Sequence, residues 1–138
     1  MQTRILTPLF LFVIALSAAC GAGSPAGEQV IKSTKAGDLN VTLSSLSGPL
    51  KHGENDLRLR FTDAAGNPVD VGAASLTFHM GAMGAMAEMN DRATLTTTET
   101  PGKYRAQVKL QMGGSWEAQI AYQGAHGTGK TSLNVQAK

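Results

Sequence analysis

The feature that most constrains the fold of this chain is a two-residue alternation of apolar and polar side chains, which runs through most of the sequence after residue 38. Its clearest stretches are 39–43, 57–61, 76–80, 104–112 and 116–122, with weaker ones at 93–95 and 133–135. Successive side chains of a β-strand point to opposite faces of a sheet, so the alternation predicts strands with one buried and one wet face.

Turn-forming residues separate these stretches. Gly-Asn-Pro at 66–68, Pro-Gly at 101–102 and Gly-Gly at 113–114 supply the positive or pre-set φ angles that tight turns need. Short strands at this spacing, each with a wet face, are typical of sandwiches. We therefore predict an all-β chain, folded as an immunoglobulin-like antiparallel β-sandwich of seven to eight strands. The single cysteine rules out a disulfide within the chain, so the likeness to immunoglobulins is architectural only.

The N-terminus has the pattern of an export signal. Arg4 is followed by an apolar stretch of twelve residues at 5–16, which is shorter than the roughly 20 residues of a transmembrane helix. Small residues at 17–19 then precede Cys20. This order predicts a cleavable signal peptide over residues 1–19. The small residues before Cys20 also resemble a bacterial lipobox, although Ser17 stands where leucine is usual.

From this pattern we expect residues 20–28 to form a lipidated Cys20 and a flexible Gly-rich tether, followed by the domain at 29–138. The protein would then lie in the cell envelope, outside the cytoplasm, with a lipid anchor in a membrane. Ordinary secretion with cleavage nearby and a free Cys20 thiol is the alternative.

Charge and motifs exclude several classes of function. The net charge is +2 and the charged residues are scattered, which argues against a nucleic-acid partner. The sequence has no HExxH motif, no cysteine pair, no phosphate-binding glycine loop and no nucleophile paired with a base. We expect a protein that is not an enzyme and that uses no organic cofactor.

Residues 79–89 contain the strongest chemical signal. Methionines recur at every third position, at Met80, Met83, Met86 and Met89. Glycines within the segment predict an irregular, adaptable backbone. Thioethers prefer Cu(I) to Zn²⁺ or hard cations, so the segment suggests a soft-metal site. A patch that contacts a partner protein, and simple packing of the loop, are the alternatives for the last three methionines.

Strand direction predicts which loops share an end of the sandwich. If every strand is antiparallel to the next, the methionine segment lies at the same end as 113–115 and 47–56, and His126 lies at the other end. The metal ligands we expect are Met83, Met86 and Met89. Supporting candidates are Met80, Met112 and His52. Met80 and Met112 are in phase with core residues, and His79 faces away from Met80, toward the polar side of its strand.

Residues 53–138 resemble the YtkA-like domain family, which is related to FixH-type proteins. The similarity rests on Gly-Glu-Asn at 53–55, Asp-Ala-Ala-Gly-Asn-Pro-Val at 63–69, the methionine segment, Pro-Gly-Lys-Tyr at 101–104 and Met-Gly-Gly-Ser-Trp at 112–116. The resemblance implies an Ig-like sandwich outside the cytoplasm, with roles near copper handling or oxidase assembly. Cys20 replaces the transmembrane anchor of FixH-type proteins, and glycines stand where relatives often have Met-Pro.

Two functions follow as hypotheses. In the first, the protein is a lipoprotein that binds Cu(I) through the methionine loop or delivers it to a copper-handling protein. In the second, it is an adaptor that binds another envelope protein through the same loop without metal.

Overall fold

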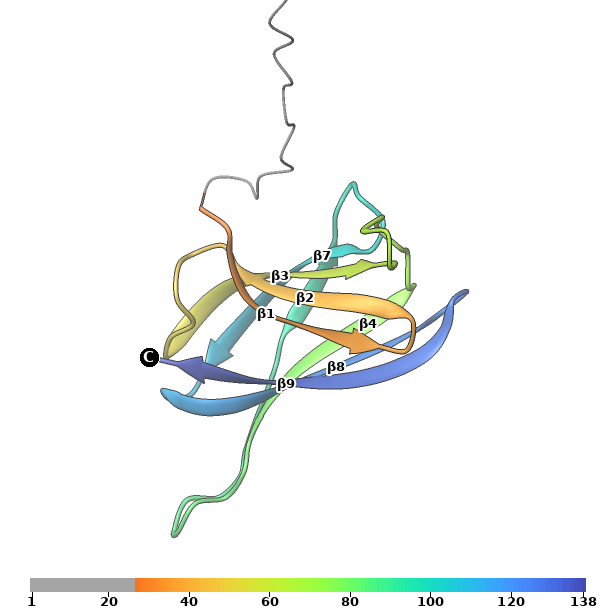
Figure 1. Ribbon diagram of the computed structural model, residues 1–138. Helices are drawn as coiled ribbons and strands as arrows, with labels where there is room; N and C mark the ends of the chain where they lie inside the picture. The colour runs from red at the N-terminus through yellow and green to blue at the C-terminus, as the bar shows by residue number, and fades with distance from the viewer. Residues whose placement is uncertain (1–26) are drawn as a thin grey trace, which may run out of the picture.

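The computed structural model describes residues 27–138, which form two antiparallel β-sheets packed face to face (Figure 1). Sheet A has the order β1-β2-β3-β7-β6 and sheet B the order β5-β4-β8-β9. The strands are β1 (Gln29–Ala36), β2 (Leu39–Ser45), β3 (Gly53–Thr62), β4 (Ala73–Met80), β5 (Met89–Arg92), β6 (Thr94–Thr97), β7 (Lys103–Leu110), β8 (Gly114–Gly124) and β9 (Gly127–Ala137). The predicted all-β sandwich is confirmed.

Residues 27–138 form nine strands, more than the seven to eight expected, for two reasons. The register of β1 on β2 shifts between Val30 and Lys32, and this irregularity breaks the two-residue pattern by which the other strands were identified. The segment after the methionines is also divided at Ala93, whose N–H donates to the carbonyl of Leu76 over 2.9 Å. β5 therefore belongs to sheet B, whereas β6 crosses to sheet A.

The core lies between the sheets and is filled by the apolar half of each alternating strand. Phe61 from sheet A is fully buried, and its ring meets those of Tyr104 and Tyr122 edge to face at centroid distances of 5.9 and 5.5 Å. This arrangement suits the aromatic quadrupole. Both tyrosine hydroxyls donate to backbone carbonyls, of Gly72 (2.7 Å) and Ala36 (3.3 Å). The core thus joins both sheets without a disulfide.

The expected signal peptide and Cys20 lie outside the described residues. Within residues 27–138 there is no helix long and apolar enough to cross a membrane. Glu28, which the sequence assigns to the tether, is held against the domain, because its side chain is only 2% exposed and is paired with two arginines.

Candidate metal site on a methionine hairpin

The methionine segment is a β-hairpin that projects beyond the sandwich, visible as the green excursion at the bottom of Figure 1. Met83 and Met86 exchange both backbone hydrogen bonds, at 3.1 and 2.9 Å, and Met80 pairs with Met89 further down the ribbon. Gly84 opens the two-residue turn with a φ of 56°. A positive φ at the first central position is typical of the type II′ turns that close hairpins.

The expected irregular backbone is therefore wrong at the tip, and the symmetry of the hairpin explains the three-residue period. The turn lies midway between Met83 and Met86, and also midway between Met80 and Met89. The four methionines are thus two cross-strand pairs. A hairpin pairs residues equally far from its turn, so methionines that are separate in sequence become cross-strand neighbours.

The two pairs have different surroundings. Met80 is 3% exposed, and Met89 is partly buried against the core. Met83 and Met86 are 54% and 45% exposed. A spacing of three residues along an extended chain reverses the side on which a side chain lies. The hairpin therefore presents one exposed pair and one pair packed at its base, not a single cluster of four thioethers.

The geometry of the exposed pair suits a soft metal ion. In a directly opposite, hydrogen-bonded pair the two Cα atoms lie about 5.5 Å apart. Methionine is unbranched with three rotatable side-chain bonds, so the two thioethers can converge on one ion. Within residues 27–138, no group of three or more His, Cys, Asp or Glu side chains is placed to hold a metal.

The topology brings the other candidates to the predicted end of the sandwich. The first residue of β8 follows Met112 and Gly113, and a Cβ on Gly114 would lie 3.2 Å from the terminal methyl of Met80. His52 lies at this end too, since its N–H donates to the C-terminal residue Lys138 at 2.8 Å. His126 lies in the turn between β8 and β9, at the opposite end.

Sharing an end does not make these side chains ligands. Met112 is partly buried against the core, and its carbonyl accepts the indole N–H of Trp116 at 3.1 Å. His52 is exposed on its own loop. The Nδ1 of His79 lies 2.9 Å from the Oδ1 of Asn90, on the outer face of sheet B and away from the buried Met80, as predicted.

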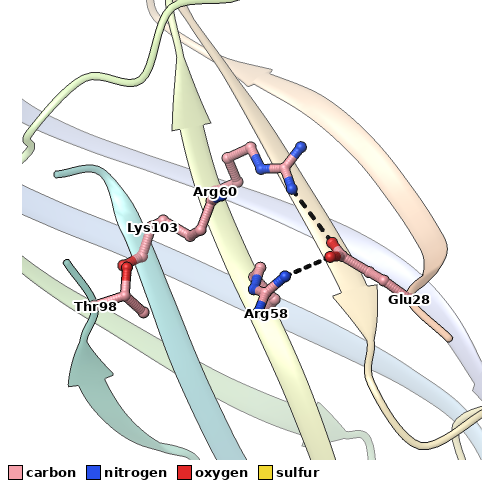
Figure 2. Close-up of polar contacts among 5 residues, drawn as sticks. All are labelled: Glu28, Arg58, Arg60, Thr98 and Lys103. Carbon is pink, nitrogen blue, oxygen red and sulfur yellow. Dashed lines mark hydrogen bonds and ion pairs between the residues drawn. The ribbon is translucent and has the colours of Figure 1, made fainter. Parts of the chain in front are cut away.

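An ion cluster on the outer face of sheet A was not anticipated. Glu28 accepts from Arg58 Nη1 at 2.5 Å and from Arg60 Nη2 at 3.4 Å, so one carboxylate bridges two cations (Figure 2). The alternation of β3 does place both arginines on the wet face. Nothing in the sequence marks Glu28 as their partner, because 30 residues separate it from Arg58.

Residues 33–121 match a family model described as YtkA-like. The match includes the whole methionine hairpin and both arginines of the cluster, and it stops short of Glu28 and β9. No curated protein and no solved structure matches the chain.

Proposed function

The chain belongs to the YtkA-like family, and from that premise we propose that it is an exported lipoprotein that binds Cu(I) at the tip of its methionine hairpin. The proposed anchor is a lipid on Cys20, and the proposed recipient of the metal is another copper-handling protein of the envelope. The family suggests a protein associated with the cell envelope, and the envelope is where an exported copper-binding lipoprotein would work.

The observation that carries the metal proposal is the exposure of Met83 and Met86. Among residues 27–138 the exposed large hydrophobic side chains are Val30 and these two methionines. Exposing apolar side chains side by side on a projecting hairpin gives up the stabilisation that burial would provide. A function at the tip explains why two thioethers are placed there.

The chemistry of thioethers fits an oxidising compartment. They bind Cu(I) without first losing a proton, so their affinity for Cu(I) should vary little with pH, whereas thiolate and imidazole sites compete with protons. Two protein ligands on an exposed tip leave coordination positions open. A receiving protein can supply the next ligand before Met83 and Met86 dissociate, which favours delivery over storage.

Anaerobic Cu(I) titration against a chromogenic competitor tests the metal proposal. Changing Met83 and Met86 together to leucine keeps the apolar bulk and removes both sulfurs. We expect Cu(I) binding to disappear, while stability changes by less than about 1.5 kcal/mol, the usual limit for volume-conserving swaps. Met112→Leu is the matched control and should leave binding unchanged. Full affinity in the double variant would dismiss the tip as the metal site.

The same protrusion also favours the second candidate, an adaptor that docks on an envelope protein without metal. Photo-crosslinking from the hairpin tip in cells grown with and without a copper chelator separates the two. A crosslinked partner that persists under chelation and is lost in the double leucine variant would favour the adaptor. A partner captured only when copper is available would favour delivery.

The anchor is tested independently of the hairpin. We expect radiolabelled palmitate to label the wild-type protein, and Cys20→Ser to remove the label and leave the protein as a precursor or release it from the membrane. An unlabelled wild type would remove the lipid from the proposal without affecting the metal site.

A further inference from the structure

The two outer faces of the sandwich differ in charge. On sheet A the outward positions carry six cations, namely Lys35, Arg58, Arg60, Lys103, Arg105 and Lys109. Three carboxylates share that face, namely Glu28, Glu54 and Asp56. Six cations against three carboxylates give the face a net charge of +3. The rest of residues 27–138 has five cations and seven carboxylates, hence −2. The chain as a whole is therefore nearly neutral, although the outer face of sheet A is basic.

Carboxylates within the face neutralise some of its cations and leave others in excess. Asp56 accepts from Arg105, and that hydrogen bond lowers the pKa of the carboxyl below its ordinary range, so the pair stays ionised. Glu28 neutralises only one of the two arginines it bridges. Lys103 lies directly opposite Arg60 at one end of the β3–β7 ladder, so two cations are adjacent there.

The outer face of sheet B has a different character. Its strands present mainly hydroxyl and amide side chains, including Ser75, Thr77, Gln119, Ser132 and Asn134. The methionine hairpin continues from this sheet and extends away from sheet A in Figure 1. A surface bound by the sheet A face would thus leave the hairpin tip free.

The position of Glu28 ties the basic face to the start of the domain. The carboxylate is almost completely covered, with its side chain 2% exposed, and both arginines point toward it (Figure 2). Ser44, which pairs with Arg58 on the outward side of β2, is likewise 2% exposed. The first described residues of the chain therefore lie on the basic face.

We propose that the outer face of sheet A rests on the anionic headgroups of the membrane in which the protein is anchored. This proposal rests on the anchoring proposed above. Glu28 lies eight positions after Cys20, and a chain of that length reaches at most about 28 Å when fully extended. A tether this short keeps the domain at the bilayer at high effective concentration. Each basic side chain near an anionic surface then raises the ratio of bound to unbound orientations about fivefold.

Lysine footprinting on vesicles tests the orientation with the protein as the cell makes it. The protein is purified from membranes and reconstituted into vesicles of phosphatidylcholine, or of phosphatidylcholine with phosphatidylglycerol. A water-soluble acylating reagent then labels lysines, which are read by mass spectrometry. We expect Lys103 and Lys109 to react about fivefold more slowly on the anionic vesicles. Lys130, on the outer face of sheet B, should react equally on both, and high salt should abolish the difference.

Charge variants link the protection to the face itself. Lys103→Gln with Arg105→Gln should remove the protection of Lys109, whereas Lys130→Gln should leave it intact. Equal labelling of Lys109 on the two kinds of vesicle, from a protein that floats with both, overturns the proposed orientation and leaves the anchor standing. If the protein does not float with neutral vesicles, the anchor fails. Labelling with anionic vesicles then still tests whether sheet A faces the membrane. Protection of Lys109 supports that orientation, and equal labelling of Lys109 overturns it.

Discussion

Gly84→Ala tests whether the hairpin turn creates the proposed Cu(I) site. The φ of Gly84 is 56°, and an added Cβ would meet no heavy atom within 4 Å. The substitution therefore acts only through backbone strain, which costs on the order of 1–3 kcal/mol for a side chain held in a sparsely populated φ/ψ region. No contact with the core confuses the result, because residues 81–88 are all exposed.

The structure sets the size of the response. Two hydrogen bonds, between Met83 and Met86, hold the tip. At about 0.5–1.5 kcal/mol each they contribute about 1–3 kcal/mol. A strain of similar size should open the tip in a large fraction of molecules while the sandwich stays folded. Opening separates the two thioethers, so Cu(I) affinity should fall, although both sulfurs remain in the chain.

Gly81→Ala is the matched control in the same segment. Gly81 has no positive φ and also has no heavy atom near the position of a Cβ, so alanine fits without strain. Removing this glycine should even stabilise slightly, by restricting the unfolded chain. Amide hydrogen exchange reports tip opening directly at Met83 and Met86, and Cu(I) titration of the same samples reports the site.

We expect Gly84→Ala to lose protection at those two amides and to bind Cu(I) more weakly, with the amides of β4 and β8 unchanged. Gly81→Ala should match the wild type in both assays. Unchanged protection in Gly84→Ala, or equal losses in both variants, would refute the link between the turn and the site. Lost protection with full Cu(I) affinity would show that the metal does not need the closed hairpin.

Four further substitutions test the fold that carries the hairpin. Gly102→Ala should destabilise by about 3 kcal/mol or more in urea unfolding, since its φ is 76° and a Cβ would overlap a backbone carbonyl; Gly66→Ala, with φ 85° and open space, should cost only about 1 kcal/mol. Trp116→Phe should cost about 2–3 kcal/mol by circular dichroism, because the buried indole donates a hydrogen bond. The Asn67 N–H donates to Asp63 and lowers the pKa of its carboxyl below the ordinary value of 3.8, so Asp63 contributes stability above that pH that is lost as pH falls through the lowered pKa. Asp63→Asn should therefore lower the melting temperature at neutral pH, and the difference should shrink below pH 3.8.

The strands that were predictable from sequence are those with one fully buried face. Between Leu57 and Phe61 every second side chain is completely buried and must be apolar, so the two-residue pattern is visible in the sequence. β1 was not predicted from the sequence. Its inward positions are Ile31, Thr34 and Ala36, and the first interval is three residues where a regular strand has two, because the register shifts there. A bulged edge strand has no regular period to detect.

The candidate site was predictable in composition but not in shape. Counting strand directions placed the methionines, His52 and the 113–115 turn at one end, since antiparallel topology determines which loops are neighbours. The pairing within the hairpin was missed, because Gly84-Ala85 lacks the Asn-Gly or Asp-Gly signature that marks most two-residue turns. The basic face was missed for a related reason, because scattered charges gather only when the register of β3 and β7 aligns them.

The hairpin also separates the proposed metal affinity from the stability of the fold, two properties that usually depend on the same residues. A ligand buried in the sandwich core would link affinity to packing, so that each change at the site would alter the stability of the fold. Here Met83 and Met86 are exposed at the tip of the hairpin. Only the base of the hairpin packs on the core, where Met80 is buried and Met89 packs against core residues. Affinity at the tip can therefore vary with little effect on folding. With the basic face toward the membrane, the tip would point outward, where another protein can reach it.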